Sequence, residues 1–301
     1  MNNQYSSINS STLTMKIEKF VEKVIEAKYA WRDFKEEFSY LVREFDYDPL
    51  LSYSTYQKCF HDYIHHLSSL NTNNVYNCVN SIDFKAMQDF FNSYHRIKQV
   101  EINDFMRSEN RNREVLIQYL DDLTQHYSKL LFIRVDLAYL TQYHQTIDIR
   151  TFKDDINKLI GYVQDQDTCF KYLEGYAWAL EQGEEKGYHC HLLLIYNGAE
   201  RQKDYYLANQ VILRWKDITD DQGYGFNCNT SEHKQQFRER GTLGIGMIHR
   251  NNPLEVNNAI NTCCYIVNPE KTNQYLRVKL PHMRTFGTGS YQRINRRYRN
   301  H

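Results

Sequence analysis

Hydrophobic positions in the first 128 residues follow the period of a helix. Apolar side chains return every three or four positions in three segments, which gathers them on one face of a helix. These segments are residues 15–30, 84–106 and 115–127. The polar stretch 71–80 predicts a loop, and either Ser81 or Asp83 is suited to cap the helix that follows. Residues 1–128 are therefore predicted to form a helical N-terminal region whose aromatic side chains pack in a small bundle.

From Lys129 the pattern is that of strands and helices in alternation. Segments rich in branched and aromatic residues predict strands, and segments with helical spacing predict helices. In chain order they are a strand at 130–140, a helix at 151–164, strands at 176–181 and 188–196, a helix around 207–215, a strand at 243–248 and a helix at 254–267. We predict an α+β fold over residues 129–289, an antiparallel sheet with helices packed on it, followed by a basic tail at 290–301.

Composition limits the class of protein without choosing a fold. Hydrophobic residues make up 41% and charged residues 25% of the 301 residues, which excludes disordered and fibrous proteins. The mean hydropathy is −0.72, no apolar run reaches the ~20 residues that span a bilayer, and the polar N-terminus lacks a signal-peptide pattern. We therefore expect a cytoplasmic protein without a membrane partner. Its seven cysteines, without CxxC spacing, are expected to be free thiols.

The net charge of zero hides an uneven distribution of charge. After Glu270 the chain has no acidic residue and eight basic ones, so the last 31 residues carry a charge of +8. Residues 1–270 hold 29 basic and 37 acidic side chains, a charge of −8. A basic C-terminal segment suits a polyanion such as nucleic acid, whereas a solvated basic tail would have the same composition. Both interpretations stay open.

The sharpest chemical pattern is Gly-Tyr-His-Cys-His at residues 187–191, followed by an apolar run. Alternate side chains of a strand share a face, so His189 and His191 point the same way and can share one divalent ion. With the hairpin turn centred on 184–185, Glu181 would lie nearly opposite His189. Two imidazoles and one carboxylate predict a site for Mn²⁺ or Mg²⁺ with open positions for phosphate oxygens. The alternative is two histidines and a glutamate on a solvated strand face.

Five elements in this order resemble a known family. They are the strand FIRVDL, the hairpin with Glu181 and GYHCH, a later GIG strand, a helix that carries a tyrosine, and RTFGTG near the C-terminus. This combination resembles the YagK/YfjJ C-terminal domain, or inovirus-type replication protein family, which is grouped with the HUH rolling-circle replication endonucleases. The resemblance extends over about residues 130–289, and residues 1–128 carry no motif of it.

The resemblance implies a metal-dependent enzyme that nicks and joins single-stranded DNA on a ferredoxin-like or RNA-recognition-like sheet. Its substrate would be the replication origin of a phage-like or mobile element, with host replication proteins as candidate partners. A metal held by Glu181, His189 and His191 would polarise and orient the scissile phosphate. A tyrosine would attack that phosphate, leaving a 3′-hydroxyl and a 5′-phosphotyrosine.

The resemblance also implies that the nucleophilic tyrosine lies on a helix after the histidine strand. Tyr265, in CCYIVNPEK, holds that place, and Tyr275 is the second candidate among 25 tyrosines. The family pattern Y-x-x-K expects a lysine where this chain has Asn268. The nearest lysine is Lys271, beyond Pro269, which is expected to end the helix.

The departure at Asn268 motivates a second hypothesis from a different class. A degenerate replication domain could bind nucleic acid as a regulator without cutting it. Such a protein would bind DNA without metal and in a salt-sensitive manner. The chain has no Walker A motif, so a fused helicase is not expected in either case.

Arginines of the C-terminal segment are the predicted DNA contacts. In RTFGTGS, Arg284 with Gly287 and Gly289 suits a phosphate contact, because glycine allows a close approach of two backbones; a plain turn is the alternative. Tyrosines interleave with the arginines of the tail, which suits stacking on bases. The tail arginines are Arg293, Arg296, Arg297 and Arg299. Arg134 and Asp136, which share one face of FIRVDL, are predicted to form a surface ion pair rather than to act in catalysis.

Overall fold

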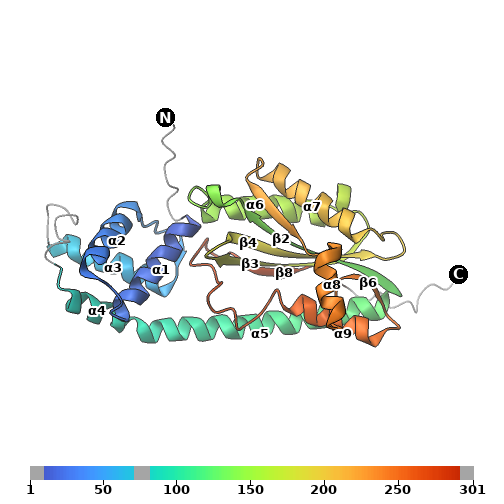
Figure 1. The fold of residues 1–301 in the computed structure, drawn as a ribbon, viewed down its shortest axis with the longest axis horizontal. Coiled ribbons are helices and arrows are strands. Elements are labelled where there is room, and N and C mark those ends of the chain that lie inside the picture. The colour runs from blue at the N-terminus through green and yellow to red at the C-terminus, as the bar shows by residue number, and fades with distance from the viewer. Residues whose placement is uncertain (1–9, 71–81, 292–301) are drawn as a thin grey trace.

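A helical bundle forms the N-terminal part of the molecule. The computed structural model describes residues 10–70 and 82–291. The bundle consists of α1 (Ser11–Ile25), α2 (Trp31–Glu44), α3 (Thr55–Leu70) and α4 (Phe84–Ser93) (Figure 1). Its core is rich in phenylalanine and includes Phe20 and Phe60. The predicted aromatic core is confirmed, and Asp83 caps α4 by accepting hydrogen bonds from the first backbone N–H groups of the helix.

One long helix, α5 (His95–His126), connects the bundle to a sheet. It has 32 residues, which at 1.5 Å per residue makes it about 48 Å long, and it runs along the whole sheet (Figure 1). Its C-terminal turns bury Leu116, Leu120 and Leu123. The sequence predicts two helices here, with a break between residues 106 and 115, but the chain stays helical. The intervening stretch is mostly exposed and needs no apolar face, since it bridges two packed regions.

An antiparallel sheet forms the second part of the molecule. Its described strands are β2 (Lys129–Tyr139), β3 (Leu173–Gly183), β4 (Gly187–Asn197), β5 (Gly223–Asn227), β6 (Gly246–His249) and β8 (Phe286–Thr288). In space they follow the order β5-β2-β4-β3-β8, and β6 pairs with β2 beyond the end of β5. Every pairing is antiparallel. The predicted α+β class with an antiparallel sheet is confirmed.

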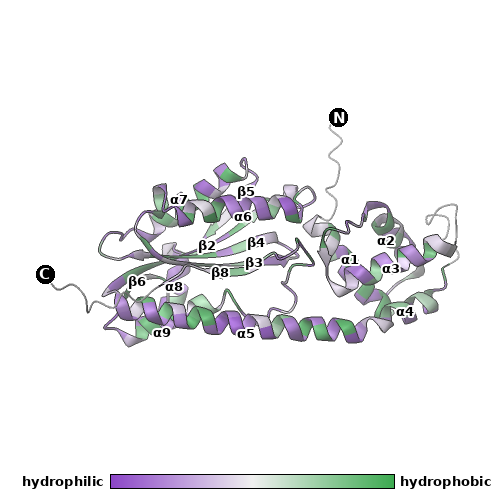
Figure 2. Ribbon diagram, turned by 180° about the vertical axis from the view of Figure 1, so that it is seen from behind, coloured by the Kyte–Doolittle hydropathy of each residue, from purple (hydrophilic) through white to green (hydrophobic). Residues whose placement is uncertain are grey.

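Helices cover both faces of this sheet. The helices α6 (Ile149–Gln164) and α7 (Asp204–Ile218) pack on one face, and α5 and α9 (Pro253–Cys264) pack on the other (Figure 1). Side chains of a strand alternate between faces, so the even-numbered residues of β2 face α5 and α9. Seen from behind and coloured by hydropathy, α5 is striped with apolar and polar residues, as a helix with one packed side should be (Figure 2).

Shorter elements complete the described fold. They are α8 (Ser231–Glu239), the 3₁₀ helices η2 (Thr141–Tyr143) and η3 (Thr168–Phe170), and the paired strands β1 (Ser52–Tyr53) and β7 (Val278–Lys279). The β1–β7 pairing joins the helical bundle to the C-terminal segment. The sequence predicts neither β5 nor α8, because β5 is a short edge strand rich in glycine and α8 has no buried residue to give it a periodic pattern.

The segment RTFGTGS contains a strand and is not a plain turn. Its residues Phe286–Thr288 form β8, which pairs with β3. A Cβ atom on Gly287 would lie 2.7 Å from the ring of Trp178, and one on Gly289 would lie 2.7 Å from the hydroxyl of Tyr119. Both glycines thus pack closely against aromatic side chains, which is a structural reason for glycine at these positions.

Two expectations drawn from composition can be compared with the described residues. Across residues 10–70 and 82–291, no helix combines the length and the apolar character needed to cross a membrane. The six cysteines in these ranges are free thiols, as the spacing predicts. Cys263 and Cys264 are both buried at the end of α9, and Cys263 belongs to the hydrophobic core between the sheet and α5 and α9.

Candidate metal centre

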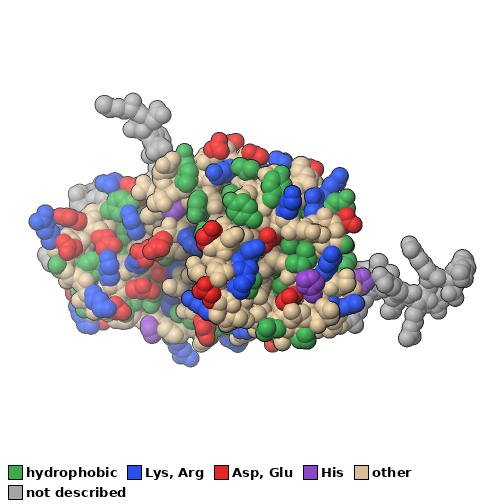
Figure 3. All heavy atoms as spheres, turned by 45° about the vertical axis from the view of Figure 1, so that its right-hand side comes forward, with side chains coloured by type: hydrophobic (Ala, Val, Ile, Leu, Met, Phe, Trp, Pro, Cys, Tyr) green, Lys and Arg blue, Asp and Glu red, His purple; other side chains and the backbone are tan. Residues whose placement is uncertain are grey.

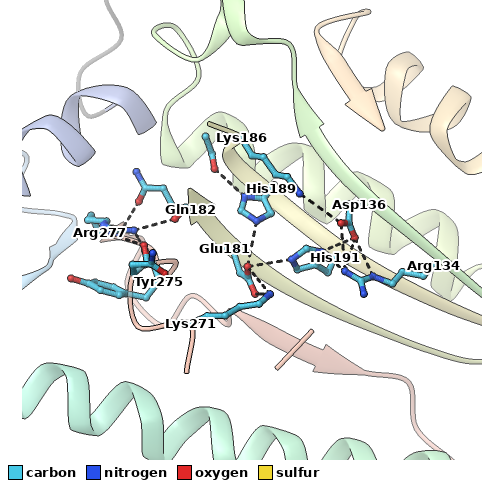
Figure 4. A network of polar contacts seen from close by, with 12 residues as sticks. Arg134, Asp136, Glu181, Gln182, Lys186, His189, His191, Lys271, Tyr275 and Arg277 are labelled. Carbon is cyan, nitrogen blue, oxygen red and sulfur yellow. Dashed lines mark hydrogen bonds and ion pairs between the residues drawn. The ribbon is translucent and has the colours of Figure 1, made fainter. Parts of the chain in front are cut away.

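The hairpin of β3 and β4 brings the three predicted metal ligands together. Glu181 pairs directly with His189, and the neighbouring Ala179 pairs with His191, so all three side chains share one face. Their potential ligand atoms lie within 4.8 Å of one another. The Glu181 carboxylate oxygen Oε2 lies 3.4 Å from Nε2 of His189 and 3.2 Å from Nε2 of His191 (Figure 4). The predicted register and shared face are confirmed.

These three side chains are buried, so the alternative of a solvated strand face is wrong. Glu181 is 9% exposed, and His189 and His191 are 3% exposed. They lie at the end of the sheet face that further along packs its apolar residues against α5 and α9. A buried cluster of ionisable side chains requires compensation by hydrogen bonds or by opposite charges.

Each histidine is oriented by an oxygen atom behind its ring. The Nδ1–H of His191 donates to Oδ1 of Asp136 at 2.7 Å, and the Nδ1–H of His189 donates to the carbonyl of Gly187 at 3.1 Å. Both Nε2 lone pairs are then directed at Glu181. Histidine ligands of metals typically have such partners, which fix the tautomer and the ring orientation. Two Nε2 atoms and a carboxylate that face one another fit a divalent cation.

The surroundings of the triad favour an ionised carboxylate at Glu181 and a neutral imidazole at His189. Burial alone would raise the pKa of Glu181, but the contacts of its carboxylate with His189 and His191 and the nearby ammonium of Lys271 hold that pKa well below its usual range. Burial lowers the pKa of His189. Both effects favour the protonation states that a metal ligand must have.

Asp136 and Arg134 form the predicted ion pair, but the pair is not at the surface. The guanidinium Nη2 lies 3.2 Å from Oδ1 of Asp136, and both side chains are largely buried. Burial opposes ionisation of Asp136, yet the hydrogen bond from His191 and the charge of Arg134 hold its pKa well below the usual range. Asp136 is thus a positioning residue for His191 that sequence reasoning missed. The register of the strands could have indicated this role, since Asp136 pairs directly with His191 across β2 and β4.

Tyr265 lies at the C-terminal end of α9, next to the triad. The helix ends at Cys264, three residues earlier than predicted, and Tyr265 is its C-cap. Its side chain is 54% exposed and lines a cavity of about 360 Å³ together with His189 and His191. The guanidinium carbon of Arg134 lies 5.2 Å from the centre of its ring.

Lys271 reaches the triad although Pro269 lies between it and the helix. Its ammonium lies 2.9 Å from Oε1 of Glu181 and 4.3 Å from the centre of the Tyr265 ring. A turn makes this approach geometrically feasible, because the N–H of Lys271 donates to the carbonyl of Asn268 and the Asn268 side chain accepts from the N–H of Glu270. The residue that replaces the expected lysine thus stabilises the turn that returns another lysine to the site.

The structure does not bring Tyr275, the second candidate nucleophile, to the triad. Its ring points away from Glu181 (Figure 4), and its hydroxyl contacts Glu18 of α1 and Lys98 of α5. Burial, with the charge of Glu18, raises the pKa of Tyr275 well above its usual range. A half-buried tyrosine whose hydroxyl is held in this network is a structural residue.

The predicted DNA contacts are not gathered at the triad. Arg284 is exposed and does not line the triad cavity. It lies near Lys153 of α6, in the opposite layer of the sheet, and the repulsion between the two positive charges helps to lower the pKa of Lys153. On the face seen in Figure 3, basic and acidic side chains are interspersed. The remaining predicted contacts lie outside the described residues: Arg293, Arg296, Arg297 and Arg299.

A comparison with protein-family models gives one match. Residues 110–235 match the model of the YagK/YfjJ C-terminal domain. The matched segment includes the C-terminal half of α5, which carries no recognisable motif, and ends within α8, so it contains Asp136 and the triad but not Tyr265 or Lys271. Neither a curated protein nor a solved structure matches the chain.

Proposed function

We propose that this chain is a metal-dependent endonuclease of the HUH type, which nicks and joins single-stranded DNA to initiate rolling-circle replication of a phage-like or mobile element. The observation that carries the proposal is the convergence of Glu181, His189 and His191 beside a cavity that Tyr265 and Lys271 also line. The family match supports the proposal, since it covers the strands that hold all three ligands.

The topology of the sheet also supports this assignment. The elements β2-α6-β3-β4-α7-β5 follow one another along the chain, and their strands lie in the order β5-β2-β4-β3. This βαββαβ arrangement is that of ferredoxin-like and RNA-recognition-like sheets. We infer that the domain is the HUH variant of this fold.

Glu181, His189 and His191 would hold a divalent cation, Mn²⁺ or Mg²⁺. When bound, the ion would supply Lewis-acid polarisation of the scissile phosphate. Asp136 and the carbonyl of Gly187 keep both imidazoles in the tautomer that such a site requires. Lys271 and Arg134 add positive charge near the position of the phosphate.

In the proposed reaction the hydroxyl oxygen of Tyr265 attacks the phosphorus, and the bond from phosphorus to the 3′-oxygen breaks. The phenol of Tyr265 loses one proton, and the leaving 3′-oxygen gains one to become a hydroxyl, so the number of protons is unchanged. The 5′-phosphate stays bonded to Tyr265, and the free 3′-hydroxyl can prime synthesis or reverse the reaction to rejoin the strand. The exposure of Tyr265 suits a nucleophile that must meet a polymer.

The alternative is a non-catalytic regulator that binds nucleic acid without cutting it. That hypothesis arises because Asn268 occupies the expected lysine position, whereas Lys271 contacts Glu181 from beyond the turn. A regulator would bind single-stranded DNA in the absence of metal and would form no covalent product.

Incubation of the protein with single-stranded origin oligonucleotides and Mn²⁺ should yield a covalent protein–DNA adduct on a denaturing gel. The variant Tyr265→Phe should form none, because it lacks the attacking oxygen. The double variant His189→Ala/His191→Ala should lose both the adduct and Mn²⁺ binding measured by calorimetry.

Tyr205→Phe is the matched control, because Tyr205 is 55% exposed, like Tyr265, but lies on α7 away from the triad. It should form the adduct at the wild-type rate. An adduct that persists in Tyr265→Phe would show that another residue is the nucleophile. DNA binding without any adduct or Mn²⁺ binding in the wild type would favour the regulator.

A further inference from the structure

A second cavity adjoins the proposed metal centre. Its volume is about 510 Å³, within the range of about 300–1,000 Å³ that small-molecule sites span. It shares Arg134, Asp136 and Tyr265 with the cavity that His189 and His191 line. The two cavities therefore lie next to each other, with these three residues at their common border.

Three aromatic rings from two elements line this cavity. His233 lies between Phe226 and Phe237, with ring centroids 5.3 Å and 5.0 Å away. Phe226 belongs to β5 and the other two residues to α8. Phe226 remains 40% exposed, so part of its ring is free to stack on a flat ligand.

Polar groups of α9 border the same cavity. The amide of Asn258 donates to the carbonyl of Gly241 at 2.8 Å, which fixes it. Asn261 is exposed, and its amide has no hydrogen-bond partner among the described residues. The amide of an asparagine has a carbonyl oxygen that accepts hydrogen bonds and an NH₂ group that donates two. These groups can form hydrogen bonds with the edge of a base.

A glycine closes the cavity against α9. A Cβ atom on Gly244 would lie 2.1 Å from the carbonyl oxygen of Asn258, so only glycine permits this approach. The approach holds Leu243 and Ile245 in the cavity lining. The result is an apolar and aromatic recess with a polar border, a combination that suits a nucleobase, whose faces are apolar and whose edges are polar.

We propose that this recess, the aromatic pocket, binds an unpaired base of single-stranded DNA next to the phosphate held at the metal centre. The aromatic pocket is lined by Phe226, His233, Phe237, Leu243, Ile245 and Asn261. The proposal rests on the proposed function, because that function puts a DNA phosphate at the adjoining triad. A base in a duplex is stacked and paired, so the aromatic pocket selects single-stranded substrate.

Binding without cleavage tests this proposal. Tyr265→Phe protein, which keeps the ring but cannot attack, is titrated in EDTA with fluorescein-labelled oligothymidylate and with a base-free deoxyribose-phosphate strand of equal length. When Phe226→Ala or Phe237→Ala is introduced into this parent protein, binding of oligothymidylate should weaken by roughly 5- to 150-fold. This is the range for the loss of one base stacked on one aromatic side chain. Binding of the base-free strand should not change.

Tyr224→Ala is the matched control for Phe226→Ala. Both residues lie on β5 and point to the same face, and Tyr224 is 47% exposed, but it does not line the aromatic pocket. It should bind oligothymidylate like the parent protein, and thermal denaturation should show all variants folded. Equal affinity in Phe226→Ala, Phe237→Ala and the parent, or an equal loss in Tyr224→Ala, would overturn the proposal.

The two proposals fail in different ways. If wild type forms the covalent adduct while the pocket variants bind both strands like the parent, the aromatic pocket is wrong and the endonuclease assignment stands. If wild type forms no adduct while the pocket variants lose only base-dependent binding, the nuclease assignment is wrong and the aromatic pocket stands as a site for single strands.

Discussion

At the scale of single residues, orientation of the imidazoles distinguishes this site from a chance pair of histidines. A strand places His189 and His191 on one face, but only Asp136 and the carbonyl of Gly187 direct both Nε2 atoms at Glu181. Asp136 has a second partner in Arg134, which keeps the carboxylate ionised in a buried place. The chemistry of the triad thus depends on residues that are not themselves ligands.

Replacing the carboxylate behind His191 should weaken metal binding without removing a ligand. Asp136→Asn keeps the size of the side chain but loses the charge that orients His191. Removal of such a partner typically costs 10- to 100-fold in metal affinity, so the Kd for Mn²⁺ from titration calorimetry should rise by about that factor. Asp155→Asn serves as control, because Asp155 is a buried carboxylate of α6 in the opposite layer. An unchanged Kd in Asp136→Asn would show that Asp136 does not contribute to metal binding.

At the scale of elements, close packing decides what the glycines do. Gly287 lies in β8 against the ring of Trp178, whereas an added Cβ atom on Gly161 of α6 would meet no atom within 4 Å. The first glycine is needed for the pairing of β8 with β3. The second only adds conformational entropy to the unfolded chain.

The two glycines should therefore respond to alanine in opposite directions. Gly287→Ala should lower the free energy of unfolding by about 1–3 kcal/mol, since it overpacks a filled space. Gly161→Ala should raise it by about 0.5–1 kcal/mol. Urea unfolding followed by circular dichroism measures both changes. Destabilisation by Gly161→Ala, or none by Gly287→Ala, would contradict the packing argument.

At the scale of the whole molecule, a buried cluster joins the helical bundle to the sheet. Glu18 of α1 contacts Lys98 of α5 and Arg277, which precedes β7, and all three are buried. Arg277 also donates to the carbonyl of Gln182, the residue after Glu181. The N-terminal region is thus attached to the strand end that carries a metal ligand. Although burial raises the pKa of Glu18, the charges of Arg277 and Lys98 lower it to about 2.

Neutralising Glu18 should destabilise the whole protein in a pH-dependent way. Glu18→Gln leaves Lys98 and Arg277 buried without a counter-charge, which should cost about 3–5 kcal/mol in unfolding free energy at pH 7. Because the folded pKa of about 2 lies below the ordinary value of 4.5 for a glutamate, the contribution of the carboxylate is complete above pH 4.5 and is lost as the pH falls towards 2. The difference between wild type and variant in urea titrations should shrink over that window.

Glu184→Gln is the control for this cluster, since Glu184 forms an exposed ion pair with Lys19 of α1. Exposed pairs contribute about 0–1 kcal/mol, so its effect should be small at every pH. A loss in Glu18→Gln no larger than that in Glu184→Gln would show that the cluster does not hold the two parts together.

Features that depend on local pattern can be read from the amino-acid sequence alone. Alternation along a strand and a short hairpin turn place Glu181 opposite His189, because the two are eight residues apart and one turn sets their register. Periodicity likewise identifies most of the helices and the strands of the central sheet. The charge of the last 31 residues is also a sequence property. Most of the arginines that contribute to this charge lie outside the described residues.

Features that depend on residues far apart in the chain emerge from the folded structure. It buries Arg134 and Asp136, brings Lys271 to Glu181 across a proline, and gives Tyr275 to the cluster around Glu18. It also assembles an aromatic pocket from β5, α8 and α9. No local pattern encodes these contacts, because each results from packing of elements whose separation along the chain is many times the period of a helix or strand.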